Sequence, residues 1–74
     1  MQIKVAIVDD DEGIRSSLSA LIERAAGFKL VGTYANGETA VKEIPKLLPD
    51  VVIMDINLPG MKGYECVRQL KAAN

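Results

Sequence analysis

Two groups of acidic residues stand where carboxylates could do chemistry. The stretch IVDDDEG, residues 7–13, places three aspartates and a glutamate directly behind an apolar run, and Asp55 ends a second apolar run, DVVIMD. Neighbouring carboxylates repel one another unless a cation or a structural partner offsets the repulsion. The sequence therefore predicts either a helix start that uses these carboxylates or a cation site built from them.

The metal chemistry open to this chain is that of oxygen ligands. Cys66 is the one cysteine and there is no histidine, so a thiolate or imidazole metal site is excluded. So few carboxylates favour Mg²⁺, which keeps several waters and takes one or two carboxylates together with phosphate oxygens. A carboxylate beside Mg²⁺ can attack phosphorus to form an acyl phosphate. Asp55 is the predicted nucleophile, and the predicted metal ligands are Asp9, Asp10, Asp55 and the main-chain carbonyl of Asn57.

Helix capping is the competing explanation for the first acidic group. Carboxylates near a helix N-terminus accept hydrogen bonds from its free N–H groups and interact favourably with the helix dipole, by about 0.3–1 kcal/mol each. Asp11 and Glu12 are predicted to do only this. Capping does not explain why Asp9 and Asp10 should share a sheet edge with Asp55, so both explanations stay open for these residues.

Composition limits the class of protein. The chain has 74 residues, of which 49% are hydrophobic and 26% charged, as expected for one small globular domain. Its formal net charge is −1 and it has no run of Lys or Arg, so direct binding to nucleic acid or to an anionic membrane is not expected. It has no apolar stretch near the roughly 20 residues of a membrane span and no signal-peptide pattern, which favours a cytoplasmic protein.

Three pairs of a strand and a helix are predicted to position the acidic residues. Short apolar runs rich in β-branched residues indicate the strands, and apolar residues at the 3.6-residue period indicate the helices. The predicted strands are 3–8, 28–35 and 51–55, and the predicted helices are 11–26, 37–48 and 63–72. Pro45 is expected to kink or end the second helix.

The alternation of strands and helices predicts an α/β fold with a parallel sheet and right-handed crossovers. The pattern alone does not fix the strand order. Ligands of open α/β sheets bind beyond the carboxyl ends of the strands, where both acidic groups lie. We expect the order 2-1-3, because it brings Asp9 and Asp10, which follow the first strand, beside Asp55 at the end of the third.

The stretches VAIVDDDEGIRSSL, YANGETAV and PDVVIMDINLPGMKGYE resemble, in this order and spacing, the receiver domain of bacterial response regulators, and the likeness spans the whole chain. The stretch LVGTYANGETAV is most similar to the subgroup joined to helix-turn-helix output domains. The resemblance implies a flavodoxin-like sheet, here truncated to three βα units. It also implies a two-component signalling module that is not an enzyme.

The resemblance further implies roles for particular residues. Asp55 would accept phosphate from a sensor histidine kinase, Asp9 and Asp10 would arrange Mg²⁺, one of them through water, and the Asn57 carbonyl would complete the metal site. Lys62 stands where members of the family often carry an acid. A receiver would continue through two more strands and helices that carry a hydroxyl residue and a lysine beside the phosphoryl group, so we expect the N-terminal portion of a receiver with impaired phosphorylation.

Two other classes of protein stay open. Haloacid dehalogenase-like phosphohydrolases also place a nucleophilic Asp after a strand, but they use a second Asp two positions on as acid and base. Asn57 stands at that position, which removes turnover and leaves phosphate acceptance. The other class is a structural or assembly fragment that forms a homodimer through the third strand, because VVIM would be an apolar edge with neither Lys nor Pro.

Overall fold

The computed structural model describes residues 2–55 and 67–71. Its elements are β1 (Ile3–Val8), α1 (Glu12–Arg24), β2 (Phe28–Tyr34), α2 (Gly37–Leu47) and β3 (Val51–Met54), and residues 67–71 are also helical. The strands pair in parallel in the order β2-β1-β3. This arrangement confirms the predicted α/β class and the order 2-1-3.

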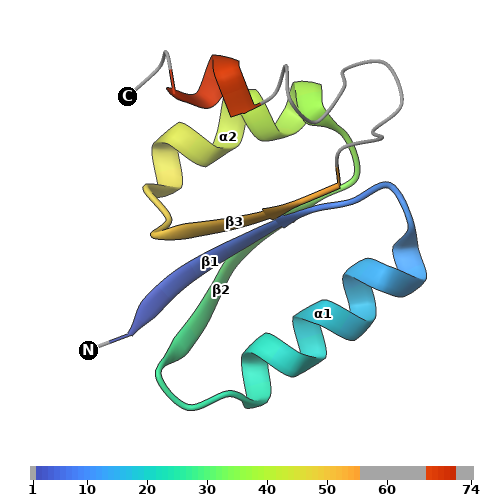
Figure 1. The fold of residues 1–74 in the computed structure, drawn as a ribbon, viewed down its shortest axis with the longest axis vertical. Helices are drawn as coiled ribbons and strands as arrows, with labels where there is room; N and C mark the ends of the chain where they lie inside the picture. The colour runs from blue at the N-terminus through green and yellow to red at the C-terminus, as the bar shows by residue number, and fades with distance from the viewer. Residues whose placement is uncertain (1, 56–66, 72–74) are drawn as a thin grey trace.

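Helices lie on both faces of the sheet. Figure 1 shows α1 on one side, and α2 with residues 67–71 on the other. Successive residues of a strand face opposite sides. Ala6 and Val8 of β1 accordingly pack with Ala40 and Ile44 of α2, while the neighbouring β1 residues, which alternate with them, are directed toward the α1 side. Because β1 is buried on both faces, its carboxyl end is held firmly at the centre of the sheet.

Helix α1 begins at a side-chain cap. The Oδ1 of Asp11 accepts a hydrogen bond from the N–H of Ile14 at 3.0 Å, so Asp11 precedes the helix rather than forming its first turn. The helix ends at Arg24, earlier than the predicted limit at 26. Gly27, with a φ of 87°, then turns the chain toward β2, and this conformation is one that glycine adopts easily.

Helix α2 runs through Pro45, which corrects the expected break at this residue. A proline inside a helix removes one main-chain donor and crowds the preceding turn. Pro45 lies in the last turn, where few further hydrogen bonds depend on it, and the N–H of Leu48 still donates to the carbonyl of Ile44 at 3.1 Å. The cap at Asn36 and the buried side chain of Ala40 hold the start of the helix.

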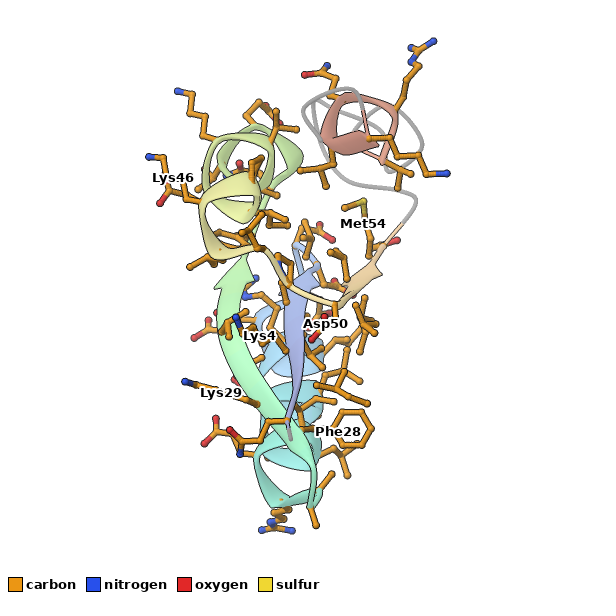
Figure 2. All side chains as sticks on the ribbon, turned by 90° about the vertical axis from the view of Figure 1, so that its left-hand side faces the viewer. Lys4, Phe28, Lys29, Lys46, Asp50 and Met54 are labelled. Atoms are coloured by element: carbon orange, nitrogen blue, oxygen red, sulfur yellow. The ribbon has the colours of Figure 1, made fainter. Side chains whose placement is uncertain are left out.

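Asp50 aligns β3 with β1. Its N–H donates to the carbonyl of Lys4 at 2.8 Å, and its Oδ2 accepts the N–H of Lys4 at 2.9 Å. Figure 2 shows the two residues side by side at the start of β3. The pairing then continues from Val51 to Met54, so Asp55 follows the strand rather than ending it.

The surface around β3 is apolar. A cavity of about 320 Å³ separates α2, β3 and residues 67–71, and its lining includes Leu48, Val52, Met54 and Leu70.

Within the described parts of the chain, no helix is long and apolar enough to cross a membrane. Of the predicted helix 63–72, residues 67–71 are described and are helical, and the other half lies outside the described residues.

Candidate metal centre

The carboxyl ends of β1 and β3 bring three aspartates together. One carboxylate oxygen from each of Asp9, Asp10 and Asp55 lies within 4.8 Å of the other two. Asp9 and Asp55 are partly buried, and Asp10 is exposed. The structure therefore places three of the four predicted ligand residues at one edge of the sheet, while Asn57 lies outside the described residues.

Asp9 is held at three of its atoms. Its N–H donates to the carbonyl of Tyr34 at 3.0 Å, and its Oδ1 accepts the N–H of Asp11 at 2.9 Å. Its carbonyl oxygen accepts a hydrogen bond from Nη1 of Arg15 at 2.7 Å. The Asp9 main chain is thus tied to β2 and to α1 at once, which fixes the direction in which its carboxylate leaves the sheet.

Asp55 is tied to the same strand end from the other side. Its N–H donates to the carbonyl of Val8 at 2.9 Å, which extends the pairing of β1 and β3 by one residue. Because Val8 directly precedes Asp9, this bond sets the Asp55 carboxylate beside the loop that carries Asp9 and Asp10. The closeness of the cluster is therefore a result of sheet geometry and not of helix capping.

The two explanations of the acidic stretch divide its residues. Asp11 caps α1 and Glu12 lies in its first turn, as expected for residues that serve the helix. Asp9 and Asp10 precede the cap and share their edge with Asp55. Capping therefore explains Asp11 and Glu12, but it does not explain why Asp9 and Asp10 lie beside Asp55.

The donor set fits a hard divalent cation. Each member of the cluster supplies carboxylate oxygen, the ligand that Mg²⁺ and Ca²⁺ take in proteins. Ca²⁺ takes six to eight oxygen ligands, whereas Mg²⁺ binds through one or two carboxylates and fills its octahedron with water. A cluster of three carboxylates, one of them exposed, suits Mg²⁺ better.

Arg15 is the residue that sequence reasoning missed. It lies one helical turn after the Asp11 cap, and its own N–H donates to the carbonyl of Asp11 at 2.9 Å. From there its partly buried guanidinium reaches back to Asp9. A long basic side chain one turn into the helix behind an acidic loop was the available signal.

Comparisons with known proteins agree with the geometry. The profile of the family described as "Response regulator receiver domain" matches residues 5–74. The chain is 40% identical over 68 residues to "Transcriptional regulatory protein YdfI" of Bacillus subtilis (strain 168), covering 92% of this chain and 32% of that protein. It is 41% identical over 68 residues to "Protein-glutamate methylesterase/protein-glutamine glutaminase 1" of Syntrophus aciditrophicus (strain SB), covering 92% of this chain and 19% of that protein.

A solved structure shares the fold closely. The response regulator domain of Thermotoga maritima CheB superposes with a TM-score of 0.94 at 33% sequence identity, over 99% of this chain and 55% of that one. The chain thus spans about half of this solved domain, and 19% and 32% of the two curated relatives. One relative is named as a transcriptional regulator and the other as an enzyme, so an attached helix-turn-helix output domain stays a prediction.

Proposed function

The chain belongs to the response regulator receiver family, and on this premise we propose that it is the phosphate-accepting part of a receiver, with Asp55 as acceptor and a sensor histidine kinase as donor. The observation that carries the proposal is the cluster of Asp9, Asp10 and Asp55, whose carboxylate oxygens lie within 4.8 Å of one another. Receivers serve two-component signalling, in which the phosphorylated aspartate is the signal.

The proposed reaction is a transfer between two side chains. A carboxylate oxygen of Asp55 forms a bond to phosphorus while the bond from phosphorus to the histidine nitrogen of the kinase breaks. Bound Mg²⁺ would supply positive charge that offsets the charge on the transferring group. Asp9 and Asp10 are the proposed residues that hold the cation, together with Asp55 and the carbonyl of Asn57.

The residues of this chain contribute mainly position. The bond from the Asp55 N–H to the Val8 carbonyl holds the nucleophile at the end of the sheet, and the three contacts of Asp9 fix the neighbouring ligand. Such preorganisation lowers the cost of bringing the acceptor, the cation and the phosphoryl group together. Turnover of the product is not proposed, because Asn57, two positions after Asp55, cannot act as a general acid.

The rate is proposed to be low for a polypeptide made of these 74 residues alone. The family resemblance implies a hydroxyl and a lysine beside the phosphoryl group, carried by strands that follow the stretch matched here. Removing one preorganised donor of this kind typically costs about 10²–10³ in rate. We expect slow acceptance of phosphate and no efficient switch of conformation.

Acetyl phosphate with Mg²⁺ provides the direct test. Intact mass spectrometry should show slow addition of one phosphoryl group to the wild-type chain and none to Asp55→Asn. Asp50→Asn is the matched control, since it makes the same chemical change in an aspartate at the opposite end of β3. An adduct that persists in Asp55→Asn, or a chain that is never modified, would contradict the proposal, and release of phosphate with turnover would favour a phosphohydrolase.

A homodimer formed through β3 is the second candidate. The observation that favours it is that, among the described residues, β3 stands at the edge of the sheet and consists of Val51, Val52, Ile53 and Met54, with Val51 44% exposed. An unprotected apolar edge strand favours pairing with another strand. This proposal is independent of phosphate acceptance, and the oligomeric state of the chain tests it.

A further inference from the structure

A cationic side chain contacts the loop that carries the acidic cluster. Nη1 of Arg15 donates to the carbonyl oxygen of Asp9 at 2.7 Å, and the arginine is partly buried. We propose that Arg15 is a positioning residue of the metal centre, which holds the Asp9 main chain so that the Asp9 carboxylate faces Asp10 and Asp55. The inference rests on the proposed function of this cluster as a cation site.

Of the three hydrogen bonds that hold Asp9, the one from Arg15 comes from the side chain of another residue. The other two involve the main-chain carbonyl of Tyr34 and the main-chain N–H of Asp11. Those contacts join Asp9 to β2 and to the start of α1, whereas the arginine joins it to the second turn of the helix. Substitution of Arg15 therefore removes one anchor of Asp9 and leaves the other two in place.

The contact goes to the carbonyl oxygen of Asp9, so it occupies neither carboxylate oxygen. A hydrogen bond from a charged donor is stronger than one between neutral groups. The guanidinium also brings positive charge to a loop that carries several acidic residues, and this charge reduces their mutual repulsion before a cation binds. In this arrangement Arg15 orders the loop without competing with a metal for ligand atoms.

The positive charge of Arg15 and its hydrogen bond to Asp9 have opposite effects on cation binding. A guanidinium near the cluster repels Mg²⁺, so loss of its charge alone would tighten binding. Loss of the anchor lets the Asp9 main chain move and weakens binding. The arginine is only partly buried, and water screens its long-range charge more than it weakens a direct hydrogen bond. We expect the positional effect to dominate, so removal of Arg15 weakens Mg²⁺ binding.

Titration of Mg²⁺ into the full chain, followed by the NMR shifts of main-chain amides, tests this sign without any measurement of phosphorylation. Arg15→Met keeps an apolar stem and removes both donor and charge, and we expect its Mg²⁺ affinity to fall about fivefold to tenfold, less than for loss of a hydrogen bond from a charged group alone, because loss of the repelling charge offsets part of the effect. Arg15→Lys keeps a long cationic donor and should restore most of the affinity. Unchanged or tighter binding by Arg15→Met would overturn the inference.

Two further variants separate the causes. Arg24→Met removes the same charge from the last turn of α1, far from the cluster, and should leave Mg²⁺ affinity nearly unchanged. Asp55→Asn tests the site itself. If Asp55→Asn abolishes the titration and Arg15→Met does not weaken it, the metal centre stands and the role of Arg15 is wrong. If Asp55→Asn leaves the Mg²⁺-dependent amide shifts unchanged, the proposed metal site itself is wrong, whatever Arg15→Met does.

Discussion

Asp10 is the exposed member of a cluster whose carboxylate oxygens lie within 4.8 Å of one another. Like charges at this separation destabilise the cation-free fold, and a divalent cation reverses the effect. Removal of one charge should therefore act in opposite directions on folding and on metal binding. A role limited to capping or solubility would not couple the two quantities in this way.

Asp10→Asn is expected to raise the free energy of unfolding without Mg²⁺ by up to about 1 kcal/mol, because it relieves repulsion at an exposed position. The same variant should bind Mg²⁺ more weakly, because one anionic ligand is lost. Urea unfolding and amide-shift titration measure the two quantities. Glu12→Gln, at the neighbouring start of α1, is the control that should leave Mg²⁺ affinity nearly unchanged. Equal effects of the two variants on Mg²⁺ affinity would count against the site.

Gly32 provides space for the ring of Tyr34. Between Val5 and Ala6 the register of β1 against β2 shifts by one residue, and Gly32 pairs with Ala6 just past this bulge. A Cβ on Gly32 would lie 2.6 Å from the hydroxyl oxygen of Tyr34. Burial, together with the nearby Glu43 carboxylate, raises the pKa of Tyr34, which is consistent with a ring packed between β2 and α2.

Gly32→Ala is therefore expected to destabilise the fold by about 1–3 kcal/mol, because the added methyl group must displace an aromatic ring. Chemical denaturation measures the loss. In a Tyr34→Ala background the same substitution should cost clearly less, since the ring is gone. An equal cost in both backgrounds would mean that the backbone at the bulge, and not the ring, requires glycine.

Asp50 is one residue that joins two strands, β3 and β1. Its N–H and its Oδ2 both form hydrogen bonds with the main chain of Lys4. These bonds hold the turn between α2 and β3 against β1, one residue ahead of the first pair of the two strands, Val5 and Val51. Asp55 lies at the other end of β3 and bonds to Val8. The position of Asp55 beside the end of β1 therefore depends on the register that Asp50 begins.

Asp50→Ala should lower the free energy of unfolding by about 1 kcal/mol, because the N–H of Lys4 loses its acceptor. Asp50→Asn keeps an acceptor oxygen in the same place and should lose less. Urea unfolding gives the energies, and hydrogen exchange at the Lys4 amide reports the bond itself. If Asn costs as much as Ala, the contribution of Asp50 is its charge and not its hydrogen bond.

Some features of this site could be predicted from the sequence, and others could not. The parallel strands predicted that Asp9 and Asp55 lie at the same edge of the sheet, but their closeness also required the order 2-1-3, which was chosen because it brings the acids together. The contact of Arg15 could not be predicted, since it depends on how far α1 is rotated about its axis and on a side-chain conformation. The expected break at Pro45 was wrong, because a proline in the last turn of a helix costs less than one in its middle.

The whole sheet has two edges with different chemistry. At one edge β2 carries Lys29 and Thr33, both exposed, and Figure 2 shows Lys29 and Phe28 on opposite sides of this strand. At the other edge β3 has four apolar residues in succession. Charged side chains protect edge strands from pairing, and their absence favours it. Leu21 of α1 is also 62% exposed.

We expect a polypeptide made of these 74 residues alone to form a two-fold dimer at micromolar concentration, with β3 antiparallel to β3 of a second copy. The paired edges would form one sheet in the order 2-1-3-3′-1′-2′. In a register centred on β3, Asp50 of one copy lies opposite Asp55 of the other, so added salt should strengthen the dimer by screening their repulsion. Sedimentation equilibrium at two salt concentrations measures both effects.

Substitutions at the two edges decide where the copies meet. Val51→Lys places a charge on the exposed start of β3 and should weaken the dimer, whereas Thr33→Lys makes the matched change on β2 and should not. A monomer at micromolar concentration, or a dimer that survives Val51→Lys and fails with Thr33→Lys, would contradict pairing through β3. A chain extended to the length of the solved relative should be monomeric if its additional residues occupy the same edge, because one edge cannot pair with two strands.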